Sequence, residues 1–374
     1  MRNKKLGNSN FLNYLNCLFW FAVNFLIFNV PNCPAQTDYL AEFSNPAHLW
    51  ENNVERIIEE AYRQCFRTKI IDGRVMNIRL PFAMRGDRDI LIEKKMQIVG
   101  DGKGSPDSLW PVIEEILESK DFDDYIKALS SGREKVIIFN MAERKWSVST
   151  DIFVVARIKA GTYRGLPHRP FVLTSGRGAL ESDIYNYLFC VGLIGFDCSG
   201  FVWHILSYIA EQAGLDLGRT LTRILGVPAG ANPALYAGTA FFNSNNSQVT
   251  AIKDSINNLR PADIMLYRDV DGTVIHSAII QSIDLSRGII RYLQCTNVGL
   301  PHERGVHDSY IYFDPANTDV SLKDPSLRWS KKRFPAFLGE EIPFVDDGER
   351  YRYRIGGRVV RLLTIQPVIE RLNR

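Results

Sequence analysis

The sequence has few cysteines and no Cys-x-x-Cys motif, and its cysteines and histidines form no cluster at zinc-finger spacing. A structural zinc is therefore not expected, and no other metal or organic cofactor is implied. Two of the six cysteines, Cys17 and Cys33, belong to the N-terminal segment, so four remain for the folded body. Four cysteines in a chain of this length exclude a disulfide framework, although one pair can still form a disulfide in an oxidising compartment.

Beyond its first residues the chain also lacks an excess of charge of either sign. It contains 45 Lys and Arg against 42 Asp and Glu, and the surplus is Arg2, Lys4 and Lys5 within residues 1–35, which hold no acid. Because affinity for phosphate groups requires surplus cations, the neutral body excludes nucleic acid as the expected partner. Hydrophobic residues make up 45% and charged residues 23% of the chain, which excludes global disorder.

The N-terminus combines the three parts of an export signal. The basic residues are followed by an apolar core, Cys17–Phe28 (CLFWFAVNFLIF), and then by the small residue Ala35. This order predicts a secretory signal peptide over residues 1–35. An uncleaved anchor is the alternative, because Phe11–Val30 reaches the length of a membrane span; a lipid-modified Cys33 fits less well. All three interpretations place the body outside the cytoplasm, as a secreted, periplasmic or cell-envelope protein, with membrane contact only through this segment.

Residues 36–175 have a mixed pattern of helix and strand. The apolar spacing predicts two helices, over 46–67 and 109–129, and four extended runs, around 74–80, 90–99, 135–141 and 151–160. No motif in this region names a ligand. A wall-targeting or regulatory role is a hypothesis based on its position before the next domain.

A second domain is predicted over residues 176–345, and a tail follows it. The domain begins with a strong helix over 197–213, continues through a loop rich in Gly, Ala and Asn over 226–250, and then contains three extended runs over 263–268, 273–283 and 288–296. Turn sequences separate these runs, which predicts an antiparallel meander. Residues 346–374 are predicted to form a basic, β-like tail with a turn at Gly356-Gly357.

Cys198 is the residue best placed for chemistry. It lies in the segment GFDCSG, at the first turn of the predicted helix. Free backbone N–H groups and the helix dipole favour an anion there, so the thiol is expected to have a lowered pKa and to react as the thiolate. Its neighbours Asp197 and Ser199 are candidates for contacts with substrate or with an oxyanion. The alternative is an inert buried cysteine, the commoner fate of a lone cysteine.

A nucleophilic thiol needs a base, and His276 is the best candidate among six histidines. It interrupts an otherwise apolar strand, where a polar ring must find a partner or a wet cleft. Gln294 lies on the next strand, and the midpoint between the two residues, position 285, falls inside the turn DLSRG, so antiparallel pairing can bring them side by side. We expect Gln294 to orient the imidazole, with Asn297 as the alternative. His204 lies on another face of the helix that carries the cysteine and is expected to be structural.

Three segments, GFDCSGFV, LRPADIMLY and HSAII, occur in this order and together resemble the NlpC-type cysteine peptidases of bacterial cell walls. The resemblance covers residues 185–297. It implies a papain-like α+β domain, with the nucleophile at a helix N-terminus packed on an antiparallel sheet. The residues that fall on the family's site are Cys198 as the nucleophile, His276 as the histidine, Gln294 as the third polar residue, and Tyr187, or alternatively Tyr185, near the oxyanion.

The sequence departs from the family's pattern in three places. The stretch 188–192 replaces a Trp-Gly-Gly-like segment, and glutamine replaces the commoner histidine at the third position. The interval between the cysteine and the histidine is longer, because it contains residues 226–250. This segment either lines the cleft or is a passive surface insertion.

The activity implied by the resemblance is that of a secreted cysteine peptidase that hydrolyses amide bonds in peptidoglycan stem peptides. Peptidoglycan, or another peptide or amide, is then the expected partner. Two alternatives remain open from the residues alone. One is a secreted protein that binds the cell wall without catalysis, and the other is an acyltransferase that uses the same Cys-His pair but passes the acyl group to an amine or a lipid.

Overall fold

The computed structural model describes fourteen stretches of the chain, all of them within the compact unit Trp50–Arg374. They are residues 53–82, 105–129, 135–140, 145–149, 171–173, 183–184, 187–188, 195, 197–244, 246–296, 305–332, 341–343, 345–353 and 355–374. The predicted signal peptide and the extended runs around 90–99 and 151–160 lie outside the described residues. None of the helices in these stretches has both the length and the apolar character needed to span a membrane.

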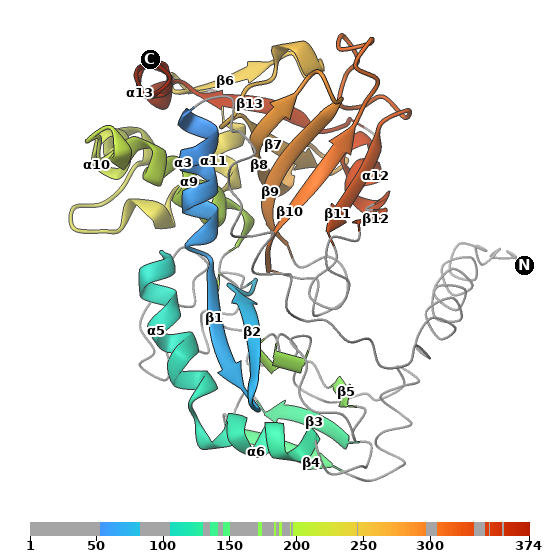
Figure 1. Ribbon diagram of the computed structural model, residues 1–374. Coiled ribbons are helices and arrows are strands. Elements are labelled where there is room, and N and C mark those ends of the chain that lie inside the picture. The colour runs from blue at the N-terminus through green and yellow to red at the C-terminus, as the bar shows by residue number, and fades with distance from the viewer. Residues whose placement is uncertain are drawn as a thin grey trace, which may run out of the picture. The chain divides into compact units, whose positions relative to one another are not determined.

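An eight-stranded antiparallel sheet is the largest element, with the strand order β12-β11-β10-β9-β8-β7-β13-β6 (Figure 1). The three runs predicted as a meander are β7, β8 and β9, and they pair as expected. The strands are β6 (Val249–Ile252), β7 (Ile264–Arg268), β8 (Val274–Asp284), β9 (Ile289–Thr296), β10 (Gly305–Tyr312), β11 (Arg328–Lys332), β12 (Glu341–Pro343) and β13 (Arg358–Leu362).

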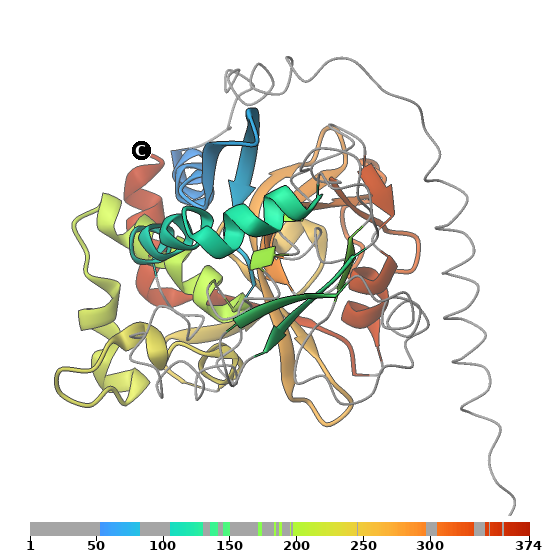
Figure 2. The ribbon, with the colours of Figure 1, turned by 90° about the horizontal axis from the view of Figure 1, so that it is seen from below.

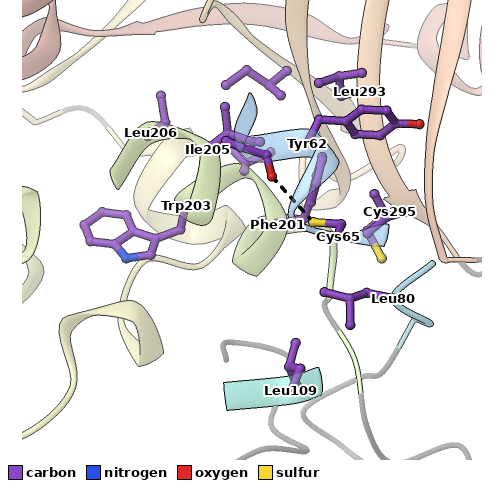
Figure 3. Close-up of a cluster of buried hydrophobic side chains, with 14 of the residues drawn as sticks. Tyr62, Cys65, Leu80, Leu109, Phe201, Trp203, Ile205, Leu206, Leu293 and Cys295 are labelled. Atoms are coloured by element: carbon purple, nitrogen blue, oxygen red, sulfur yellow. Dashed lines mark hydrogen bonds between the residues drawn. The ribbon is translucent and has the colours of Figure 1, made fainter. Parts of the chain in front are cut away.

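One face of this sheet, here called the helix face, is covered by α3 (Asn53–Arg63) and α9 (Cys198–Gln212). Side chains alternate along a strand, so every second residue of β8 and β9, including Ile279 and Leu293, points to these helices. The helices contribute an apolar stripe to the same core, and Figure 3 shows its α9 part, Phe201 and Ile205, beside Leu293. Burial of this stripe explains why the predicted helix forms here.

The opposite face, here called the aromatic face, carries a second core rich in aromatic rings. Tyr267 on β7, Tyr292 on β9 and Trp329 on β11 point to this side and pack with Tyr351 of α12 (Val345–Arg352). Figures 1 and 2 show α12 on the side of the strands away from α3. The two faces therefore have separate cores, and the sheet lies between them.

The tail predicted over residues 346–374 is part of this sheet. Its strand β13 lies between β7 and β6, so no break in the sheet coincides with the expected boundary at 345. The predicted turn is present, with Gly356 at φ 70°. The tail is only partly β-like, since it also forms α12 and α13 (Gln366–Leu372). These helices form because α12 packs on β11 and β7, and α13 packs on α3 and α9.

The region before α9 also differs from the sequence prediction in two places. The first helix ends at Arg63, not at residue 67, because Cys65 accepts a hydrogen bond from Leu80 N and the chain continues as a hairpin of β1 (Phe66–Ile71) and β2 (Arg74–Arg79). The single helix predicted over 109–129 is two helices, α5 (Pro106–Leu117) and α6 (Lys120–Leu129). Ser119 separates them, because its hydroxyl donates to Ile116 O and accepts from Phe122 N.

A three-stranded sheet in the order β4-β3-β5 completes this region. Its strand β3 (Lys135–Asn140) was predicted, whereas β4 (Lys145–Ser149) and β5 (Phe171–Leu173) were not. The segment 226–250, predicted as a loop, follows α10 (Leu217–Leu225) and contains the short helices η2 (Pro233–Leu235) and α11 (Thr239–Asn243) and the start of β6. Its helix α11 forms because Phe241 and Phe242 are buried. The fold is thus α+β with antiparallel sheets, as predicted.

Candidate functional site

Cys198 occupies the first position of α9, as predicted; it is in no disulfide and is partly exposed. Asp197 is the N-cap of the helix, and its carboxylate accepts hydrogen bonds from Gly200 N and from the Ser199 hydroxyl, the latter at 3.1 Å. Both residues predicted to contact substrate or oxyanion are therefore engaged in capping the helix. The cap fixes the first turn of the helix, where the thiol lies.

His276 and Gln294 are brought together by β8 and β9, as predicted. His276 Nε2 lies 2.6 Å from Gln294 Oε1. The register differs slightly from the expected one, because Gln294 lies directly opposite Ala278 and the histidine is its diagonal neighbour on the same face. The two side chains meet because residues two apart on a strand point to the same side of the sheet.

The imidazole lies in a dry, aromatic environment. His276 is only 3% exposed, and the ring of Tyr267 packs against it at 5.0 Å between centroids. Burial, followed by the positive charge of Arg350, lowers the pKa of His276 to about 3, and the hydrogen bond to Gln294 only partly opposes this. The ring is therefore neutral near pH 7, the form in which an imidazole accepts a proton.

Three residues that the sequence analysis missed complete this network. Gln294 Nε2 donates to Asp347 Oδ2 at 2.7 Å and lies 3.0 Å from Ser309 Oγ, and Tyr292 donates its hydroxyl proton to the same carboxylate oxygen at 2.7 Å. Asp347 is fully buried, which raises the pKa of its carboxyl group. The available signal was the spacing of Asp347 and Tyr351, which places both on one side of a helix, but the tail was interpreted as strand.

Cys198 begins α9, which packs on the other face of the sheet. Cys198 shares the stripe of α9 that includes Phe201 and Ile205, which packs on the helix face. Cys295 of the sheet lies on that face. Its pKa is raised mainly by burial and further by electrostatic interaction with Cys65 and Cys198. His276, by contrast, packs with Tyr267 on the aromatic face. The helix α9 and the imidazole thus lie on opposite faces of the sheet.

The remaining predicted residues are placed as follows. Tyr187 is buried and packs against the rings of Phe122 and Tyr125 of α6, at 5.0 and 4.9 Å between centroids. Tyr185 and Asn297, the two alternatives, lie outside the described residues. His204 is structural, as expected, because its Nε2 lies 3.1 Å from Ala61 O of α3.

Other candidates for a role in the site are the remaining cysteines and the possible metal ligands. Cys65, Cys198 and Cys295 form no disulfide, and Cys190 lies outside the described residues. Figure 3 shows Cys65 and Cys295 in the helix-face core beside Phe201. Within the described stretches no group of three or more His, Cys, Asp or Glu side chains could hold a metal ion.

Comparison of the chain with protein-family models, with curated proteins and with solved structures found no match.

Proposed function

We propose that this chain is a secreted, papain-like cysteine peptidase of the NlpC type that hydrolyses amide bonds in peptidoglycan stem peptides. The observation that carries the proposal is the 2.6 Å contact between His276 Nε2 and Gln294 Oε1. An imidazole held at Nε2 by an amide oxygen has its other nitrogen, Nδ1, left for a thiol proton. The thiol at the N-terminus of a capped helix is the matching nucleophile.

The proposed reaction is acyl transfer through a thioester. The Cys198 sulfur attacks the amide carbonyl while His276 Nδ1 accepts the thiol proton, and the imidazolium then protonates the leaving amine as the C–N bond breaks. Water next attacks the thioester and gives a proton to the imidazole, which passes it to the sulfur as the C–S bond breaks; this restores the thiol and releases the acid. The backbone N–H of Cys198 is a donor for the oxyanion. Gln294 orients the ring without adding a charge.

Proton transfer requires the sulfur and the ring nitrogen to lie about 2.6–3.2 Å apart, or to be joined by one water. Because α9 and the imidazole lie on opposite faces of the sheet, the proposal requires the sulfur and Nδ1 to come within this distance when substrate binds. The decisive property is therefore the reactivity of Cys198 and its dependence on His276.

The test uses the full chain, purified peptidoglycan and defined amide substrates, with products identified by mass spectrometry. We expect hydrolysis by the wild type, loss of it in Cys198→Ala and in His276→Gln, and retention in His204→Gln, which removes a structural imidazole from the same helix. Circular dichroism verifies that each variant is folded. Equal turnover by wild type and folded Cys198→Ala would disprove the proposal, and transfer of the acyl group to an amine or lipid would instead identify an acyltransferase.

A second candidate function, a secreted cell-wall protein that binds without catalysis, is favoured by one observation. The His276 ring is buried on the face of the sheet away from α9 and has a pKa lowered to about 3, so forming an imidazolium there is costly. The rate of alkylation at Cys198 separates the two candidates. A catalytic thiolate reacts rapidly near neutral pH and slows in folded His276→Gln, whereas a binding protein has a slow thiol that does not respond to the substitution.

A further inference from the structure

We infer that Asp347 is a positioning residue that sets the orientation of the Gln294 amide and, through it, the tautomer of the His276 ring. The assignment of the tautomer stands on the hydrogen-bond geometry alone. Its consequence for catalysis rests on the proposed function. The residue comes from the C-terminal part of the chain, 53 positions after Gln294, and reaches the site only because α12 packs on the aromatic face.

The first step concerns the amide of Gln294, whose oxygen and nitrogen ends are distinguished by their partners. An ionised carboxylate only accepts hydrogen bonds. Asp347 Oδ2 lies 2.7 Å from one end of the amide and 2.7 Å from the Tyr292 hydroxyl. Reversing the amide would place its oxygen against Oδ2, which already accepts the Tyr292 proton, so neither of these two oxygens would have a proton to donate. The NH₂ end therefore faces Asp347.

The second step excludes the other neighbour as the deciding group. Ser309 Oγ lies 3.0 Å from the same amide nitrogen, but a hydroxyl both donates and accepts and can rotate to suit either orientation. Gln294, Ser309, Tyr292 and Asp347 are all fully buried, so solvent does not compete for these bonds. Asp347 is thus the one described partner of the amide whose ionised form accepts but cannot donate.

The third step passes from the amide to the imidazole. With its NH₂ end on Asp347, Gln294 presents Oε1 to His276 Nε2 at 2.6 Å. An amide oxygen accepts and cannot donate, so Nε2 must carry the proton in this contact. In the neutral ring Nδ1 then holds the lone pair. The chain Asp347–Gln294–His276 therefore leaves Nδ1 as the ring nitrogen able to take a thiol proton.

The test reads the tautomer directly by ¹⁵N NMR of the full chain with labelled histidine, near pH 7. We expect His276 of the wild type to be a single neutral tautomer with its proton on Nε2. Asp347→Asn replaces a pure acceptor with a group that both donates and accepts, so Gln294 can reverse, and a substantial population with the proton on Nδ1 is expected. The matched control is Glu349→Gln, which removes an exposed carboxylate from the same helix and should leave the His276 signals unchanged.

A wild type with the proton on Nδ1, or a folded Asp347→Asn that keeps the wild-type tautomer, would overturn the inference. If Asp347→Asn does not fold, Tyr292→Phe serves as the second variant, because it keeps the bond between Asp347 and Gln294 and must keep the proton on Nε2. Under the proposed function, folded Asp347→Asn should also lose about 10²–10⁴-fold in kcat at nearly constant KM. Absence of any wild-type hydrolysis would defeat the proposed function while leaving the tautomer result intact.

Discussion

The two faces of the eight-stranded sheet are stabilised in different ways. On the helix face, apolar stripes of α3 and α9 pack on β8 and β9, and one ion-pair cluster links the helix to the sheet: Arg291 contacts Glu59 of α3 at 2.6 Å and Asp308 of β10 at 3.0 Å. On the aromatic face, a chain of buried hydrogen bonds runs from Asp347 through Gln294 to His276, surrounded by tyrosine rings.

This difference separates the roles of the faces. Apolar packing stabilises without direction, whereas a buried polar chain stabilises only when each donor finds its acceptor, and it thereby selects one arrangement of the side chains. The helix face thus holds α9 and its terminal thiol in place, and the aromatic face specifies the orientation of an imidazole. The following predictions test this division, in order of decreasing effect.

The largest effect is expected for Arg291→Met on the helix face. The substitution leaves Glu59 and Asp308 buried without their shared cation, so the free energy of unfolding should fall by about 3–5 kcal/mol. Urea denaturation measures the change. The control is Arg287→Met, which removes an exposed partner of Asp284 and should cost about 0–1 kcal/mol. Equal small effects in the two variants would show that the buried cluster does not hold α3 to the sheet.

A smaller loss is expected for Tyr292→Phe on the aromatic face. It removes one hydrogen bond to the buried Asp347 carboxylate, which should cost about 1.5–3 kcal/mol. The matched control is Tyr351→Phe, because the Tyr351 hydroxyl is buried in the same core and has no hydrogen-bond partner among the described residues. That variant should be neutral or slightly stabilising. A similar loss in both would mean that ring packing, and not the polar chain, determines stability here.

The pH dependence of stability should report on His276. An unfolded histidine binds a proton below pH 6.5, whereas the folded ring stays neutral down to about pH 3. Between these values the unfolded state holds one more proton, so stability falls as the pH falls, by about 1.4 kcal/mol per pH unit for this group. Denaturation of wild type and His276→Gln between pH 4.5 and 6 measures the difference in slope. An unchanged slope in folded His276→Gln would show that the ring is already protonated in the native state.

The smallest effects compare one buried serine on each face. Ser309→Ala removes a partner of Gln294 on the aromatic face and should cost about 1 kcal/mol. Ser277 is on the helix face, and its buried hydroxyl has no hydrogen-bond partner within the described stretches, so Ser277→Ala should be neutral or slightly stabilising. Thermal unfolding monitored by calorimetry measures both changes. A reversed order would show that the polar chain does not extend to Ser309.

Much of this fold can be predicted from local pattern. The helix that begins at Cys198 and the meander of β7, β8 and β9 follow from apolar periodicity and turn residues, and both are confirmed. The predictions fail where a local signal is weak. Ser119 ends one helix and begins the next through hydrogen bonds of its own side chain, and α12 has a polar sequence whose helix is stabilised by packing Asp347 and Tyr351 on the sheet.

The candidate site, too, was predictable in part. The pairing of His276 with Gln294 was predictable, because the turn between their strands limits the register and residues two apart share a face. The face of the sheet that this pair occupies relative to α9 was not predictable. Alternation along a strand says which residues point to the same side, but not which side the cysteine-bearing helix will cover. The role of Asp347 was also beyond prediction, because no local rule relates residues 53 positions apart.

The sequence by itself determined the local elements: a thiol at a helix start, a histidine inside an apolar strand, and a glutamine on the next strand beyond a turn. These depend on interactions between near neighbours in the chain, which composition and spacing record. Only the tertiary structure decided that α9 and the imidazole lie on opposite faces and that a carboxylate from the C-terminal helix reaches Gln294. Such contacts depend on how distant segments fill one another's buried surface, a property of the whole packed sheet.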